Sequence, residues 1–236
     1  MPFLPVHSDQ IIRHIAAPYL TWGAILICVA AHLALWGQPA FETARILYQF
    51  GFVAGALFGD LPQEALPFAL PQTGTLVTYA FLHGSNGHLI GNMVVLFVFG
   101  GAVEDRFRHA GFAMLYLGAA VAGALAEGLA APDSGRVLIG ASGAVAGVMG
   151  AYIVLFPRAR ITILLPIFLS VRMRAWVIIG AWLLYDILML VWGEGSVAWL
   201  AHLAGFAVGV LGALMVRGKD PPGPTGIWPA DRAGRR

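Results

Sequence analysis

One serine stands in a stretch that otherwise consists almost entirely of small and apolar residues. The stretch, residues 135–152, reads GRVLIGASGAVAGVMGAY, and Ser142 is its only serine. A serine hydroxyl is a poor nucleophile at neutral pH unless a base, most often a histidine imidazole, takes its proton. Ser142 is therefore a candidate nucleophile, provided that the fold brings a histidine to it.

Other polar or ionisable side chains lie in similarly apolar surroundings, namely His88, Asn92, Glu127, Asp186 and His202. Such a side chain is costly at membrane depth, which makes each of them a functional candidate. His202 is the candidate base. Asn92, His88 and the backbone N–H of Ser142 are candidate hydrogen-bond donors to the oxyanion of an acyl-transfer reaction.

The overall composition indicates a membrane protein. The chain has 236 residues, of which 59% are hydrophobic and only 11% are charged, and its mean hydropathy is +0.79. Soluble domains carry roughly 25% charged residues. The net charge of +2 gives no reason to expect nucleic acid as a partner. The single cysteine, Cys28, excludes an intrachain disulfide and a multi-cysteine metal site, and no motif for a cofactor is present.

Apolar stretches of about the length that a helix needs to cross a bilayer recur along the chain. They lie near 18–36, 86–103, 112–131, 141–156, 175–192 and 197–216. The sequence thus predicts an all-α membrane protein, with a six-helix domain over 18–216 between an N-terminal segment (1–17) and a disordered tail (217–236). Residues 37–73 combine prolines with apolar residues, so we expect a long first loop associated with the membrane.

The positions of the basic residues predict the orientation of the spans. Twelve of the 14 basic residues fall in the N-terminal segment, the second and fourth connections and the tail, while Arg45 and Arg136 fall elsewhere. The positive-inside rule therefore places both termini in the cytoplasm. All basic residues except Lys219 are arginines, a bias typical of a GC-rich bacterial genome, so the expected location is a bacterial inner membrane.

This orientation places four candidate residues at one depth. The second, fourth and sixth spans run inward, and His88, Asn92, Ser142 and His202 all lie near the beginnings of these spans. Small residues at four-residue spacing in the fourth and sixth spans would let the two helices pack closely, so that Ser142 can reach His202. No acid lies near the start of these spans, so the residues favour a Ser–His dyad over a triad.

Three segments resemble the rhomboid family of intramembrane serine proteases. They are FLHGSNGHLIGNMVVLFVFGGAVEDRF (81–107), GASGAVAGVMGAY (140–152) and AHLAGFAVGVL (201–211), which are similar to the family's His-x-x-x-Asn, Gly-x-Ser-Gly and Ala-His-x-x-Gly motifs. The resemblance covers roughly residues 74–216. It implies a structural role for Glu104, at the cytoplasmic end of the second span.

The resemblance also implies a function and a role for each site residue. Ser142 would be the nucleophile and His202 the general base, with Asn92 and His88 at the oxyanion site of a water-filled cavity that opens outward. The substrates would be transmembrane segments of membrane proteins, cleaved near the external face of the bilayer.

Two other interpretations compete with the protease. A non-catalytic rhomboid-like protein would bind and escort membrane proteins, but such proteins have typically lost the serine or the histidine. Asp186, in LLYDILML, resembles a residue of intramembrane aspartyl proteases, yet those need a second intramembrane aspartate, which this sequence lacks. Asp186 is then expected to face the bundle or a water-filled gap. Glu127 is expected to reach the outer interface, and His83 to order the loop before the second span.

Overall fold

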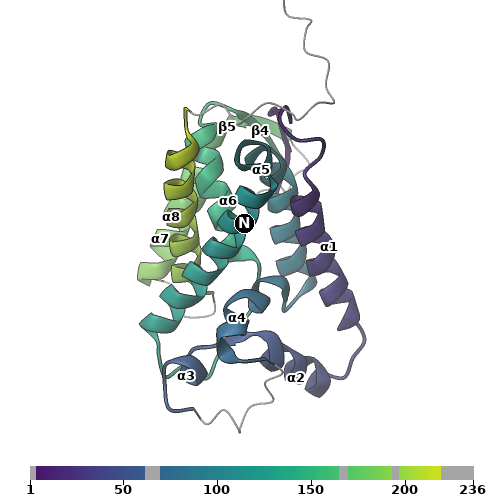
Figure 1. Ribbon diagram of the computed structural model, residues 1–236, viewed down its shortest axis with the longest axis vertical. Helices are drawn as coiled ribbons and strands as arrows, with labels where there is room; N and C mark the ends of the chain where they lie inside the picture. Colours follow the sequence, from purple (N-terminus) through teal and green to yellow (C-terminus); the bar gives the residue numbers. More distant parts are fainter. Residues whose placement is uncertain (1–3, 62–69, 165–169, 193–196, 219–236) are drawn as a thin grey trace, which may run out of the picture.

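Apolar helices dominate the computed structural model, which describes residues 4–61, 70–164, 170–192 and 197–218 (Figure 1). The long helices are α1 (Tyr19–Ala34), α5 (Asn86–Ala130), α6 (Ser142–Leu155), α7 (Ala175–Trp192) and α8 (Trp199–Val216). In the described part of the chain, α5, α7 and α8 are long and apolar enough to cross a membrane, and α1 and α6 are apolar but shorter. The prediction of six spans therefore remains a prediction.

Helix α5 covers both the second and the third predicted span. Its backbone leaves the helical region at Arg108, where φ is 62° and ψ is 168°, so two helices meet there. The break falls between the two predicted intervals, next to the pair of arginines that was expected to separate them.

The close packing predicted for the fourth and sixth spans is present between α6 and α8. A Cβ atom on Gly205 would collide with the carbonyl of Gly143, and one on Gly209 would collide with the carbonyl of Gly147. Only glycine lets the two backbones come this close, so the small-residue spacing sets the distance between the helices that carry Ser142 and His202.

Two small sheets show that the all-α prediction was incomplete. Strands β1 (Leu4–Ser8), β4 (Arg160–Leu164) and β5 (Ser170–Arg174) form an antiparallel sheet in the order β1-β4-β5. A second antiparallel pair joins β2 (Phe52–Val53) to β3 (Val137–Leu138). Polar and apolar residues alternate in RITIL (β4) and SVRMR (β5), which is the period of a strand, and exposure alternates with them in the structure.

The segment expected as a long first loop contains short helices. They are α2 (Ala40–Phe50), α3 (Ala54–Leu57) and α4 (Gln72–Thr78), which leads into the 3-10 turn η2 (Tyr79–Phe81). These elements gather at the end of the bundle opposite to β4 and β5 (Figure 1). Residues 62–69, within the predicted loop, and the predicted tail from residue 219 onward lie outside the described residues.

Two buried acids tie α5 to the N-terminal part of the chain. Glu104 accepts hydrogen bonds from the backbone N–H groups of Leu20 and Thr21, at 3.0 and 2.8 Å, and so caps the start of α1. Asp105 accepts from three consecutive N–H groups around His14 and lies 2.7 Å from His14 Nδ1. The contacts of Glu104 agree with the structural role that the resemblance implied.

Candidate active site

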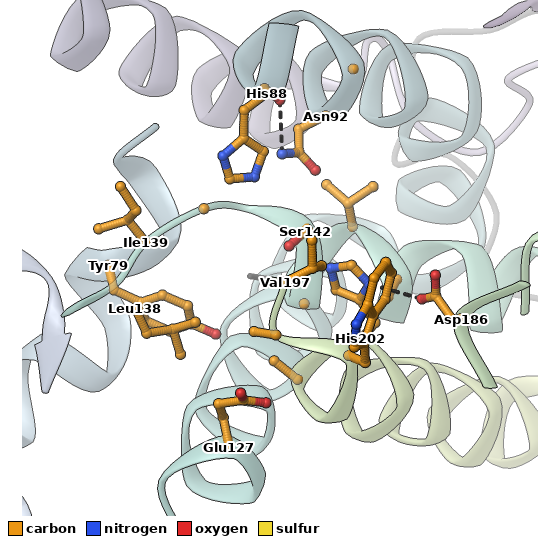
Figure 2. A pocket seen from close by; sticks show the side chains of 18 of the residues that line it. Tyr79, His88, Asn92, Glu127, Leu138, Ile139, Ser142, Asp186, Val197 and His202 are labelled. Atoms are coloured by element: carbon orange, nitrogen blue, oxygen red, sulfur yellow. Dashed lines mark hydrogen bonds and ion pairs between the residues drawn. The ribbon is translucent and has the colours of Figure 1, made fainter. Parts of the chain in front are cut away.

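A cavity of about 970 Å³ is lined by all six polar residues that the sequence places in apolar surroundings as functional candidates. It is lined by His88, Asn92 and Glu127 from α5, Ser142 from α6, Asp186 from α7 and His202 from α8 (Figure 2). Residues from four helices thus meet at one place, as the shared depth of four of them predicted. Among the residues that the structure describes, no group of three or more His, Cys, Asp or Glu could hold a metal ion.

Ser142 is the first residue of α6, and its side chain is partly accessible. The first backbone bond of the helix runs from the N–H of Val145 to the carbonyl of Ala141. The N–H groups of Ser142, Gly143 and Ala144 therefore have no partner within the helix, and they form the positive end of its dipole. A developing oxyanion beside Ser142 would face these donors.

The turn before Ser142 depends on Gly140. Its φ is +128°, a conformation that side-chain-bearing residues rarely adopt. A Cβ atom there would lie 2.6 Å from Cε1 and 2.8 Å from Nε2 of His88. The first glycine of the Gly-Ala-Ser-Gly segment thus lets the His88 ring lie against the backbone that leads to Ser142.

His202 lies in the first turn of α8 and is 8% exposed. Its Nδ1 lies 2.8 Å from Oδ2 of Asp186, a carboxylate that is 1% exposed. The sequence favoured a Ser–His dyad because no acid lies near the starts of the inward-running spans, yet the structure places the Asp186 carboxylate, from the middle of α7, beside His202. Asp186 and His202 lie on consecutive helices, a few residues either side of the connection between them, and in an antiparallel helix pair such residues meet. That spacing is the sequence signal that could have found the pair.

Ser142 and His202 line the same cavity without being hydrogen-bonded to each other. The packing of α6 on α8 brings Gly143, next to Ser142, against the carbonyl of Ala201, next to His202. Within the described ranges, no hydrogen bond joins the Ser142 hydroxyl to the imidazole. The structure therefore brings the predicted nucleophile and base to one site, where they are not hydrogen-bonded to each other.

Asn92 and His88 occupy the first two turns of α5, on the face toward the cavity (Figure 2). The amide nitrogen of Asn92 donates to the carbonyl of His88 at 3.0 Å. An amide carries two N–H groups, so one of them remains to donate elsewhere. The backbone N–H of His88 donates to Oγ of Ser85, which caps the start of α5.

His83 contacts the turn before Ser142 as well as His88. Its Nε2 accepts the backbone N–H of Ala141 at 3.5 Å, and its ring packs edge-on against His88 with centroids 5.1 Å apart. Burial, and then the neighbouring His88 and His32, lower the pKa of His83 from 6.5 to about 4. The ring is neutral at pH 7 and can accept a hydrogen bond there.

Glu127, which was expected to reach the outer interface, lines the cavity. One of its carboxylate oxygens is buried with no hydrogen-bond partner in the part of the chain that the structure describes. The carboxylate interacts with the backbone of Leu200 and Ala201, at the start of α8. A negative charge is favourable at the N-terminus of a helix, so Glu127 supports the turn that carries His202.

The comparisons with known proteins identify the family of this chain. A family model described as the rhomboid domain matches residues 71–219. RHOMBOID-like protein 12, mitochondrial, of Arabidopsis thaliana is 32% identical over 61% of this chain and 46% of its own length. Rhomboid protein 1, mitochondrial, of Saccharomyces cerevisiae is 36% identical over 58% of this chain and 40% of its own.

Rhomboid-related protein 2 of Mus musculus is 29% identical over 64% of this chain and 50% of its own length. The chain thus spans half or less of the length of these relatives. The family model covers more than half of the chain, including α5, α6, α7, α8 and the cavity between them. This chain is a membrane protein of the rhomboid family.

Proposed function

We propose that this protein is an intramembrane serine endopeptidase that cleaves transmembrane segments of membrane-protein substrates. The observation that carries the proposal is the joint placement of Ser142 and His202 in one cavity, on two helices held together by glycine contacts. Membership of the rhomboid family, whose members are generally serine proteases of this kind, supports the same activity.

In the proposed reaction, Ser142 Oγ attacks the carbonyl carbon of the scissile bond while His202 Nε2 takes the hydroxyl proton. Collapse of the tetrahedral intermediate breaks the C–N bond, and His202 passes the proton to the leaving amine. Water, deprotonated by His202, then hydrolyses the acyl ester on Ser142. The first step requires the Ser142 hydroxyl to come within hydrogen-bond distance of His202 Nε2.

The oxyanion of the tetrahedral intermediate would be held by the N–H of Ser142, the free amide N–H of Asn92 and the ring of His88. These donors surround the cavity from the start of α6 and the first turns of α5. A donor of this type stabilises the transition state by about 3 kcal/mol.

We also propose the six-span arrangement with both termini in the cytoplasm. The two halves of α5 on either side of Arg108 each hold about 22 residues, which at about 1.5 Å per residue reach roughly across the hydrocarbon core. The arginines of β4 and β5 lie at the opposite end of α6 from Ser142, which fits a cavity near the external face. The arginine-rich composition supports a bacterial plasma membrane.

Substrate chemistry follows from the site. A helical transmembrane segment hides its carbonyls in its own hydrogen bonds, so it must unwind locally before Ser142 can attack. We expect segments that contain glycine or proline near the cut to be preferred, and the family resemblance favours a small residue just before the cut.

A fluorophosphonate probe tests the activated serine directly. We would label the wild type, Ser142→Ala and His202→Ala in detergent, and in parallel follow cleavage of a glycine-containing transmembrane substrate in proteoliposomes. The proposal predicts labelling and cleavage by the wild type and neither by the two variants.

Wild-type label that persists in His202→Ala would contradict the role of His202 as the base. A folded wild-type protein that neither takes the probe nor cleaves the substrate would exclude the protease and favour a non-catalytic rhomboid protein. The next experiment would then be a search for bound membrane-protein clients.

A further inference from the structure

Asp186 and His202 form a buried carboxylate–imidazole pair that the proposed Ser–His reaction does not use. Oδ2 of Asp186 and Nδ1 of His202 are 2.8 Å apart, and the two side chains are 1% and 10% exposed. The pair joins α7 to α8 beside the cavity (Figure 2). A carboxylate buried among membrane helices costs free energy, so such a residue is a candidate for a functional role.

The contact with Asp186 bears on which nitrogen of His202 carries the proton. An ionised carboxylate only accepts hydrogen bonds, so when Asp186 is ionised the 2.8 Å contact places a proton on Nδ1 of His202. In a neutral imidazole the other nitrogen, Nε2, then has a free lone pair. Nε2 has no hydrogen-bond partner among the described residues, and His202 lines the cavity together with Ser142. The nitrogen left free is the one that a serine proton would need.

Two tryptophans hold the ring in this orientation. The Trp182 ring lies 5.8 Å from the imidazole, tilted by 35°, and the Trp199 ring lies 5.9 Å away at 88°. They come from α7 and α8, the helices that also carry Asp186 and His202. The imidazole is thus packed between two tryptophan rings while its Nδ1 contacts Asp186.

We infer that Asp186 is the positioning residue of this site, which holds His202 through Nδ1, leaves Nε2 free for the Ser142 proton and stabilises the imidazolium that then forms. The inference rests on the proposed function. It replaces the expected Ser–His dyad with a Ser142–His202–Asp186 relay assembled from three helices. Because Asp186 acts through His202, its loss should lower kcat and leave KM nearly unchanged.

A second His–Asp pair provides a matched control. Asp105 Oδ2 lies 2.7 Å from Nδ1 of His14, and Asp105 is 3% exposed. This pair lies outside the cavity, and Asp105 also accepts three backbone N–H groups. Asp105→Asn therefore makes the same chemical change in a second carboxylate–histidine pair and should cost stability without altering the tautomer of His202.

The experiment compares wild type, Asp186→Asn, Asp105→Asn and Ser142→Ala in two measurements. The first is the rate of fluorophosphonate labelling, with kcat and KM for the proteoliposome substrate. The second is nitrogen-15 NMR of histidine-labelled protein, in which the His202 signals are those missing from His202→Gln. We expect the wild-type signals to show a protonated Nδ1 and a bare Nε2.

Asp186→Asn should lower the labelling rate and kcat by about 10²-fold or more and shift His202 away from this tautomer, because a neutral amide can donate to Nδ1. Asp105→Asn should change neither. Labelling of Asp186→Asn within about threefold of wild type would overturn the inference, as would wild-type His202 protonated on Nε2. The wild-type spectrum keeps the inference testable even if Asp186→Asn fails to fold.

A wild type that is not labelled contradicts the proposed protease, whereas the spectrum still reports on Asp186. Labelled wild type with an unaffected Asp186→Asn contradicts the relay alone. The two failures are therefore distinguishable.

Discussion

Kinetic measurements can distinguish the proposed role of Asn92 as an oxyanion donor from a purely structural role in helix packing. It is 8% exposed, and one of its amide N–H groups is bound to the carbonyl of His88. If the other stabilises the oxyanion, Asn92→Ala should lower kcat by about 10²-fold, equivalent to about 3 kcal/mol, with little change in KM.

The measurement is steady-state cleavage of several substrates in proteoliposomes, alongside a melting curve. Turnover unchanged for all substrates would remove Asn92 from the oxyanion site. A large fall in melting temperature with unchanged turnover would assign it to helix packing alone.

His83 should make the stability of the folded protein depend on pH. Its pKa is lowered from 6.5 to about 4 by burial, so the unfolded chain takes up a proton before the folded one does. The contribution of His83 to the free energy of unfolding is therefore fully present above about pH 6.5. It falls by up to about 3 kcal/mol as the pH drops toward about 4. A protonated His83 also cannot accept the N–H of Ala141.

Melting curves in detergent between pH 7.5 and 4 test this prediction. His83→Gln, which keeps an acceptor but cannot titrate, should lose stability less steeply over this range than the wild type. His7→Gln, on the exposed surface of β1, serves as the control and should follow the wild type. Parallel curves for wild type and His83→Gln would contradict the prediction.

At the scale of elements, the contact between α6 and α8 decides whether Ser142 and His202 can meet. A Cβ atom on Gly205 would collide with the carbonyl of Gly143, and backbone cannot yield as a flexible side chain can. Gly205→Ala should therefore cost about 1–3 kcal/mol of stability and lower the rate of fluorophosphonate labelling.

Gly180→Ala on α7 is the matched control, because a Cβ atom there meets nothing within 4 Å. It should leave labelling unchanged and slightly raise the melting temperature, since alanine is the better helix former. Thermal unfolding and labelling of the two variants are compared with wild type. Equal behaviour of Gly205→Ala and Gly180→Ala would show that this contact does not position the site.

At the scale of the whole molecule, the proposed orientation predicts which surfaces face outward. Cys28, the single cysteine, is buried, so Cys28→Ser provides a background for new cysteines. Two exposed residues can be replaced by cysteine in this background. Asp133 lies between α5 and α6, and Ser170 lies at the start of β5.

A membrane-impermeant maleimide should label Asp133→Cys in intact cells. It should label Ser170→Cys only after the membrane has been permeabilised. The Cys28→Ser background should stay unlabelled in both conditions. The reverse pattern would invert the proposed topology and place the cavity on the cytoplasmic side.

Much of this arrangement could be predicted from the sequence because it depends on local properties. Hydropathy located the apolar helices within a few residues, and the arginines at 106 and 108 marked the break within α5. Small residues at four-residue spacing predicted that α6 and α8 pack closely, since only missing side chains allow such contact. The predicted orientation placed Ser142 and His202 near the beginnings of two inward-running spans, and both residues line the cavity.

The sequence by itself determined the family, the apolar helices and the polar residues that line the cavity. Composition, hydrophobic period and motif spacing depend only on the order of residues in the chain. Only the tertiary structure decided that Asp186 hydrogen-bonds His202 and that β1 joins the β4–β5 hairpin. These are pairings between separate elements, and they depend on how each helix is rotated and how each strand is aligned. The spacing of Asp186 and His202 about the connection between α7 and α8 allows the two side chains to meet, but no local property of the chain specifies the helix rotation that brings them into contact.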